Sequence, residues 1–202
     1  MTTGIKTVVL GEATTGKTSI VTKLVKDRFS ENTDTTIGAS FLVGKNGKFK
    51  DFQFDFWDTA GQERFLAIVP MYYKKAEIIL LTFDLSKLST IDRLAYFLEK
   101  IKQEVMNDFE VIIIGNKLDL VTNIDEIDRY VRDELDDFTD IIGTTDYVYV
   151  STKTGKNFDL LLNKIIEKGT KIMNLKSANF DNDVITVTYE KPSSFYKCSY
   201  CV

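Results

Sequence analysis

Short apolar runs alternate along the chain with segments in which apolar side chains recur at helical spacing. Runs with the character of strands occupy residues 5–10, 41–43, 52–57, 78–83, 111–114 and 147–150. The apolar positions with helical spacing are Ile20, Val21, Leu24 and Val25, then Ile91, Leu94, Ala95, Leu98, Ile101 and Val105, and finally Phe158, Leu161, Leu162, Ile165 and Ile166. This alternation predicts an α/β fold in which helices cover both faces of a mixed, mostly parallel sheet of six strands.

One pair of predicted strands is expected to be antiparallel. Asn46 and Gly47 lie between the runs 41–43 and 52–57, and this dipeptide is a strong signal for a two-residue hairpin turn. The runs 78–83 and 111–114 are almost entirely apolar, which is typical of strands covered on both faces. The sheet is therefore predicted to hold one hairpin beside its parallel strands.

The alternation fades after about residue 174, which predicts a single domain over residues 1–173 and a flexible tail over 174–202. With 44% hydrophobic residues the domain can bury a full core. The net charge of −4 supplies no basic face for a nucleic acid, so we expect no nucleic-acid partner. No apolar run approaches the ~18 residues of a membrane span, and residues 1–9 lack the apolar centre of a signal peptide. A cytoplasmic location is the expectation.

A phosphate-binding loop follows the first predicted strand and precedes the first predicted helix, which is the context that this motif requires. The motif consists of Gly11, Glu12, Ala13, Thr14, Thr15, Gly16, Lys17 and Thr18, and Ser19 follows it. Its backbone N–H groups can form an anion-binding nest. Lys17 supplies a positive charge to the β- and γ-phosphates, and the Thr18 hydroxyl can ligate Mg²⁺. The loop alone does not choose between ATP and GTP.

The sequence Asn116-Lys117-Leu118-Asp119 makes that choice, because it directly follows the run 111–114. A carboxylate at Asp119 can accept hydrogen bonds from N1–H and the exocyclic amine of guanine, whereas adenine presents an acceptor at N1. A buried polar group left unpaired in this way discriminates by ~10⁴ or more. The ligand is therefore predicted to be GTP or GDP, and an ATP-dependent kinase is a poor fit.

A third motif follows the run 52–57 and carries the expected hydrolysis chemistry. Asp58 is placed to hold Mg²⁺ through a water, the Gly61 N–H can contact the γ-phosphate, and Gln62 can orient the attacking water. Thr36 can bring a second hydroxyl to Mg²⁺ once GTP is bound. The chain has no histidine, but phosphoryl transfer depends mainly on positioning and electrostatics. Lys17, Thr36, Gly61 and Gln62 are the predicted catalytic residues.

These three motifs, in this order and spacing, resemble the Ras superfamily of small GTPases over about residues 4–173. Within it the chain looks like a Rab, on the matching stretches 36–41, 57–65 and 71–76 and the strand ending at Asp84. The segments 11–13 and 37–39 are most similar to the early-endosomal branch. The resemblance implies two nucleotide-sensitive loops, near residues 32–41 and 61–73. It also implies that Phe29 packs on the guanine, that Ser151, Thr152 and Lys153 complete the base pocket, and that effectors bind a face made of Ile37, Phe41, Trp57, Phe65 and Tyr72. For Phe41, Trp57 and Tyr72 the alternative is ordinary core packing.

The resemblance also implies a set of partners and a place of action. The expected partners are a nucleotide exchange factor, a GTPase-activating protein, effectors and an escort or GDI-type chaperone. The protein itself is expected to be a monomer. The place is the cytosolic face of intracellular membranes, with endosomes as the candidate organelle, in vesicular traffic. Two alternatives stay open: a GTP-binding module that recruits effectors but barely hydrolyses GTP, and a soluble switch unrelated to membranes.

Three residues depart from the family pattern. Ala13 stands where many relatives have glycine and points toward the γ-phosphate region, so we expect slow intrinsic hydrolysis, near ~10⁻⁴ s⁻¹. Thr15 replaces a usual valine, and Thr152 replaces the alanine usual in the base-binding segment. Because the family uses the backbone N–H at that last position, little loss of affinity is expected.

Both cysteines, Cys198 and Cys201, fall at the end of the chain. A structural zinc site needs four ligands, and the chain has neither a third cysteine nor a histidine. The remaining possibilities are inert cysteines and lipid attachment, and the Rab resemblance favours geranylgeranylation of both. One lipid chain gives marginal binding without a polybasic neighbour, so a stable anchor is expected to need both cysteines.

Overall fold

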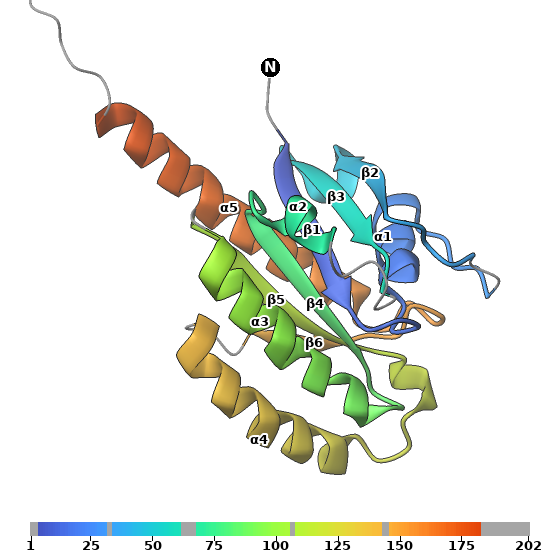
Figure 1. Ribbon diagram of the computed structural model, residues 1–202. Helices are drawn as coiled ribbons and strands as arrows, with labels where there is room; N and C mark the ends of the chain where they lie inside the picture. Colours follow the sequence, from blue (N-terminus) through green and yellow to red (C-terminus); the bar gives the residue numbers. More distant parts are fainter. Residues whose placement is uncertain (1–3, 32–33, 62–67, 106–107, 143–145, 183–202) are drawn as a thin grey trace, which may run out of the picture.

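The computed structural model describes residues 4–31, 34–61, 68–105, 108–142 and 146–182. Six strands form one sheet in the order β2-β3-β1-β4-β5-β6 (Figure 1). Their bounds are β1 Ile5–Gly11, β2 Ala39–Lys45, β3 Gln53–Thr59, β4 Ile78–Asp84, β5 Glu110–Asn116 and β6 Tyr147–Tyr149. All neighbouring pairs are parallel except β2 and β3. The predicted α/β fold with a mixed, mostly parallel sheet is confirmed.

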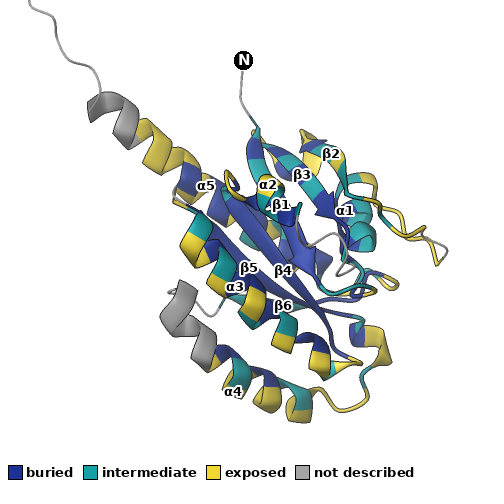
Figure 2. Ribbon diagram, in the orientation of Figure 1, coloured by how far each residue is buried: buried dark blue, intermediate teal, exposed yellow. Residues whose placement is uncertain are grey.

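The helices divide between the two faces of the sheet. They are α1 Lys17–Lys26, α2 Val69–Tyr73, α3 Asp92–Glu104, α4 Ile124–Ile142 and α5 Phe158–Asn182, with short 3₁₀ helices η1 Gly47–Phe49, η3 Leu88–Thr90 and η4 Leu118–Leu120. One apolar cluster unites side chains of α2, α3 and α4 with the sheet, and a second unites those of α1 and α5 with it. The sheet is therefore covered on both faces, and β4 and β5 are buried at every position (Figure 2).

The connection between β2 and β3 differs from the prediction. Lys45 pairs with Gln53, so residues 46–52 form a longer loop that contains η1. Phe49 is 2% exposed, and its ring lies 5.8 Å from that of Phe54. The prediction of a two-residue Asn-Gly turn was wrong, because burial of Phe49 outweighs the local turn preference of the dipeptide.

The last helix, α5, continues to Asn182 and so extends past the expected domain boundary at residue 173. In Figure 1 its end projects beyond the sheet. Residues 183–202 lie outside the described residues, and the division into a domain and a flexible tail stays a prediction. Among the helices that the structure describes, none combines the length and the apolar character that crossing a bilayer requires.

The carboxyl ends of four strands meet at one edge of the sheet. β1 ends at Gly11, β3 at Thr59, β4 at Asp84 and β5 at Asn116, and their parallel registers place these ends side by side. Open α/β sheets bind their ligands in the crevice at this edge. All three sequence motifs leave the sheet here.

Candidate nucleotide-binding site

A cavity of about 450 Å³ opens at the carboxyl ends of the strands. Its lining includes most of the predicted site residues: Ala13, Thr14, Gly16, Lys17, Thr18, Ser19, Phe29, Thr36, Gly61, Asn116, Lys117, Asp119, Thr152 and Lys153. Five predicted residues are not part of this lining, namely Gly11, Glu12, Thr15, Asp58 and Ser151. Gln62, Phe65, Cys198 and Cys201 fall outside the described residues. The cavity therefore brings the three motifs together, while the roles of their residues toward a ligand stay predictions.

The phosphate loop wraps around the start of α1. Gly16 and Thr14 both have positive φ, +93° and +65°, which turns the backbone so that successive N–H groups can face one concave side. The Lys17 ammonium donates hydrogen bonds to the carbonyl oxygens of Gly11, at 3.0 Å, and of Glu12, at 2.8 Å. Burial lowers the pKa of Lys17 to about 8, against the raising effect of Asp58 and Glu12. Lys17 is therefore mostly protonated at neutral pH, and the two carbonyl oxygens hold its ammonium in place.

The residues expected to hold Mg²⁺ form one group of oxygens. The Thr18 hydroxyl donates to Asp58 Oδ2 at 2.7 Å and lies 2.9 Å from the Thr36 hydroxyl. Ser40, which the sequence did not suggest, places its hydroxyl 3.4 Å from the same carboxylate oxygen. Asp58 Oδ1 is buried with no hydrogen-bond partner among the described residues. Burial raises the pKa of Asp58, and the Thr18 hydroxyl and Lys17 oppose that rise. Hydroxyl and carboxylate oxygens with an unpaired buried acceptor fit a hard cation such as Mg²⁺.

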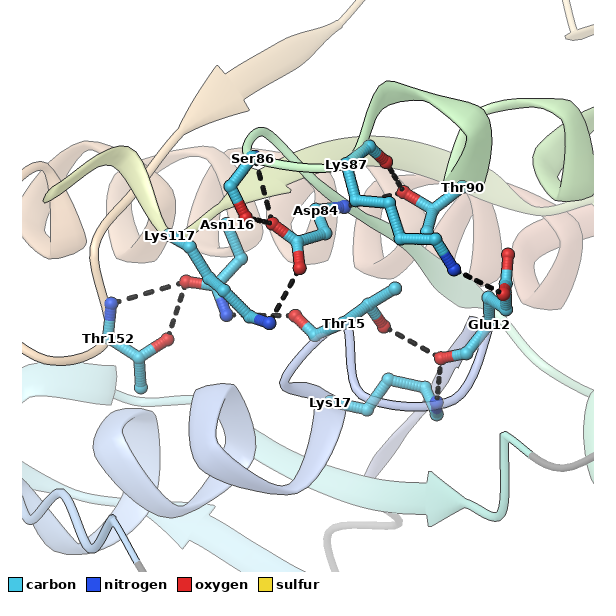
Figure 3. A network of polar contacts seen from close by, with 10 residues as sticks. All are labelled: Glu12, Thr15, Lys17, Asp84, Ser86, Lys87, Thr90, Asn116, Lys117 and Thr152. Carbon is cyan, nitrogen blue, oxygen red and sulfur yellow. Dashed lines mark hydrogen bonds and ion pairs between the residues drawn. The ribbon is translucent and has the colours of Figure 1, made fainter. Parts of the chain in front are cut away.

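Asn116 connects the two halves of the cavity. Its side-chain Nδ2 donates to the carbonyl of Thr15 in the phosphate loop at 2.9 Å. Its Oδ1 accepts from the Thr152 backbone N–H at 3.2 Å and from the Thr152 hydroxyl at 2.7 Å. The Thr15 hydroxyl in turn donates to the carbonyl of Glu12 at 3.0 Å (Figure 3). Thr15 and Thr152, the two threonines that depart from the family pattern, therefore both donate hydrogen bonds within one network.

Asp119 lines the cavity and is exposed. The Ser151 hydroxyl donates to Asp119 Oδ1, which fixes the carboxylate from behind. Phe29 is 37% exposed and lines the cavity. This position is compatible with the predicted packing of its ring on the guanine. At the rim, Lys153 forms an ion pair with Glu31 at 2.8 Å. The cavity lining therefore includes one exposed carboxylate, Asp119, and one exposed aromatic ring, Phe29.

Asp84, like Ser40, is a residue of this region that the sequence did not single out as part of the site. It ends β4 beside Asn116 of β5, and its carboxylate pairs with the ammonium of Lys117 at 2.6 Å. Its place at the end of a buried strand, beside the strand that carries the guanine motif, was the available signal.

An aromatic surface lies next to the cavity. The Trp57 ring lies 5.2 Å from Phe41 and 5.7 Å from Tyr72, and Trp57 and Tyr72 also pack against the core. Phe41 is 51% exposed and Ile37 is 80% exposed. Three of the four aromatic residues predicted for effector binding, Phe41, Trp57 and Tyr72, therefore form one contiguous group that is only partly buried.

Comparison with known proteins gives a consistent assignment. The sequence model described as "Ras family" matches residues 6–171. The GTP-binding protein YPT53 of Saccharomyces cerevisiae is 42% identical over 125 residues, which cover 60% of this chain and 56% of the yeast protein. The putative ras-related protein Rab-5B of Dictyostelium discoideum is 32% identical over 169 residues, 82% of this chain and 75% of that protein. Human Ras-related protein Rab-22A is 34% identical over 163 residues, 80% and 81% of the two chains. This chain therefore belongs to the Ras family of small GTPases, on the Rab side of that family.

Proposed function

We propose that this chain is a Rab-type molecular switch that binds GTP, hydrolyses it to GDP and recruits effectors in vesicular traffic only while GTP is bound. The observation that carries the proposal is that one cavity is lined both by Asp119, the proposed partner of the base, and by Lys17, Thr18 and Thr36, the proposed partners of the phosphates and Mg²⁺. A site of this size with few convergent polar groups suits one small ligand.

The base is selected by Asp119. Its Oδ1 accepts from Ser151, and the carboxylate can accept from the N1–H and amine donors of guanine. Adenine would place the acceptor N1 against this carboxylate. The carboxylate would then be shielded from water without gaining a hydrogen-bond donor in exchange. Phe29 would cover one face of the base.

The phosphates would lie over the loop and against Lys17. An ammonium has three N–H donors, and two of them are directed to the carbonyls of Gly11 and Glu12. This leaves one for a phosphate oxygen and fixes its direction. Thr18, Thr36 and, through a water, Asp58 would hold Mg²⁺, which when bound supplies positive charge against the charge developing on the β- and γ-phosphates.

Hydrolysis would rely on positioning, since the chain has no histidine to act as a base. The Gly61 N–H would hold the γ-phosphate, and Gln62, outside the described residues, would orient the water. Gly61 packs against Ala13: a Cβ built on Gly61 would lie 2.8 Å from Ala13 Cα. The slow intrinsic rate that we propose, near ~10⁻⁴ s⁻¹ and raised by an activating protein, rests on Ala13, whose methyl would lie near the γ-phosphate where many relatives have glycine. A single-turnover rate above ~10⁻¹ s⁻¹ without any partner would contradict it.

Thr36 links the occupancy of the site to its shape. Its hydroxyl contacts Thr18 at 2.9 Å, and the exposed Ile37 and Phe41 follow it in the chain. A loop held by the γ-phosphate and Mg²⁺ is released on hydrolysis. The effector surface would therefore change when GTP becomes GDP.

The test is a change of base specificity at Asp119. In Asp119→Asn the amide can donate to O2 of xanthine and accept from its N1–H, but it meets the amine of guanine with the wrong group. We expect the affinity for GDP to fall on the order of 10⁴-fold and that for xanthosine diphosphate to exceed it, measured by competition against a fluorescent nucleotide. Asp125→Asn, an exposed carboxylate on α4 outside the cavity, is the matched control and should leave both affinities unchanged. Unaltered GDP binding by Asp119→Asn would overturn the assignment.

We also propose attachment to the cytosolic face of an intracellular membrane, with endosomes as the candidate, through lipids on Cys198 and Cys201. One lipid chain alone gives marginal membrane binding. Cys198→Ser and Cys201→Ser should therefore each move most of the protein to the soluble fraction of a cell lysate, whereas Ser199→Ala should not. If both single cysteine variants stay on membranes, attachment by two lipids is wrong.

A further inference from the structure

Asp84 is a buried carboxylate beside the proposed nucleotide site, but it does not line the cavity. Its side chain is 6% exposed. Its Oδ1 accepts from the backbone N–H of Ser86 at 2.9 Å and from the Ser86 hydroxyl at 2.6 Å, while its Oδ2 receives the ammonium of Lys117 at 2.6 Å (Figure 3). Both oxygens are therefore held, and the carboxylate has one orientation.

The strand register explains why Asp84 can reach Lys117. Asp84 is paired with Asn116 in the parallel β4–β5 ladder, so Lys117 begins the chain segment that leaves the sheet next to Asp84. Burial alone would raise the pKa of Asp84, but the bonds from Lys117 and Ser86 outweigh it and lower that pKa. The carboxylate is thus ionised at neutral pH and is the counter-charge of Lys117.

Lys117 combines an unusual backbone conformation with a partly exposed side chain at the cavity. Its backbone has a φ of +65°, an uncommon left-handed conformation for a residue with a side chain. Its side chain is 32% exposed and lines the cavity. A lysine stem has many rotamers when its ammonium is unpaired, so a free Lys117 would sample orientations other than the one that faces the ligand.

We propose that Asp84 is a positioning residue that holds Lys117 in its orientation toward the bound guanine nucleotide and thereby slows nucleotide release. The inference rests on the proposed function, because it assumes that the cavity binds that nucleotide. The competing role is purely structural: through Ser86, Asp84 stabilises the turn after β4, and Lys117 is incidental.

A double-mutant cycle separates the two roles. The full chain is loaded with GDP that carries a fluorescent label on its ribose, and the release rate is measured for wild type, Asp84→Asn, Lys117→Met and the double variant. We expect Asp84→Asn to release the nucleotide about 10- to 100-fold faster, in line with the strength of hydrogen bonds between charged groups. The double variant should release it no faster than Lys117→Met alone, because Asp84 acts through Lys117.

Two controls fix the meaning of the cycle. Ser86→Ala removes a hydroxyl from the turn but keeps the ion pair, so it should change the release rate less than threefold. Asp146 is also a carboxylate paired with lysines, Lys164 and Lys168, but it lies outside the cavity. Asp146→Asn should therefore lower the stability of the fold without changing the rate of nucleotide release. If Asp84→Asn does not fold, Asp84→Glu, which keeps the charge but displaces it, takes its place in the same cycle.

The outcomes are distinguishable. If the wild-type chain binds no labelled GDP, the proposed function fails. If the wild type binds it, but Asp84→Asn releases it at the wild-type rate or the two single effects add in the double variant, the positioning role of Asp84 is overturned while the proposed function stands.

Discussion

Replacing Gly16 by alanine tests how the phosphate loop is fixed to the strand that carries the guanine motif. Gly16 has a φ of +93°, and a Cβ placed on it would lie 2.2 Å from Nδ2 of Asn116. That amide nitrogen donates to the carbonyl of Thr15. The alanine methyl and this hydrogen bond cannot both be accommodated, so Asn116 must move.

The cost has two parts. A left-handed backbone costs an L residue roughly 1–2 kcal/mol relative to glycine. Displacing Asn116, which is 2% exposed, leaves buried polar groups without partners, at roughly 1–3 kcal/mol. Gly16→Ala should therefore lower the free energy of unfolding by about 2–5 kcal/mol. Gly47 is the matched control: its φ is +49° and no heavy atom lies within 4 Å of an added Cβ. Gly47→Ala should show only the backbone part, about 1–2 kcal/mol.

Urea unfolding of the nucleotide-free protein measures both variants, with the fluorescence of Trp57, the single tryptophan of the chain, as the signal. The two variants are compared when the slope of their unfolding free energy against urea concentration is the same, so that a difference in stability appears only as a difference in midpoint. A Gly16→Ala variant no less stable than Gly47→Ala would show that the contact with Asn116 contributes nothing, and the reasoning would be wrong.

Three further predictions concern other parts of the molecule. Phe49→Ala should cost about 3–5 kcal/mol of unfolding free energy because it empties a buried site between Phe54 and Phe56, and a loss no larger than that of the half-buried control Phe52→Ala would contradict this. The pKa of Asp146 is lowered: burial would raise it, but Lys164 and Lys168 outweigh burial. Its ionised form therefore adds stability above its unfolded pKa, near about 4, and that stability disappears as pH falls through the lower folded value. The difference in stability between wild type and Asp146→Asn should thus be full near pH 6 and shrink in acid, and a difference independent of pH would count against it. Finally, Thr18→Ala should abolish the slowing of GDP release by Mg²⁺, which a titration with EDTA checks; unchanged sensitivity to EDTA would remove Thr18 from the proposed metal site.

The parts of the fold that the sequence predicted share one property: their signal is local. β4 and β5 are buried at every position, so each is an apolar run with little interruption. The phosphate loop needs its residue types at fixed spacing, so its place between the end of β1 and the start of α1 was predicted.

The parts that were missed depend on contacts between distant segments. Helix α4 was not predicted, because its stretch is rich in charged residues and of its described side chains only Val131 and Leu135 are buried. The β2–β3 loop followed the burial of Phe49 rather than its Asn-Gly dipeptide. The pairing of Asp84 with Lys117 depends on the β4–β5 register, which no single segment encodes.

The unequal burial of the strands has a consequence for local unfolding. β5, which leads into the guanine motif, lies in the interior of the sheet, whereas β2, which carries Phe41, is an edge strand with one buried residue. Amide hydrogens in such edges exchange through small local openings, while those in a buried central strand exchange only through near-global unfolding. Amides of β5 should therefore exchange orders of magnitude more slowly than those of β2. The guanine motif would then follow β5, a strand that rarely opens. The surface offered to partners would include β2, a strand that can change shape at a small cost in free energy.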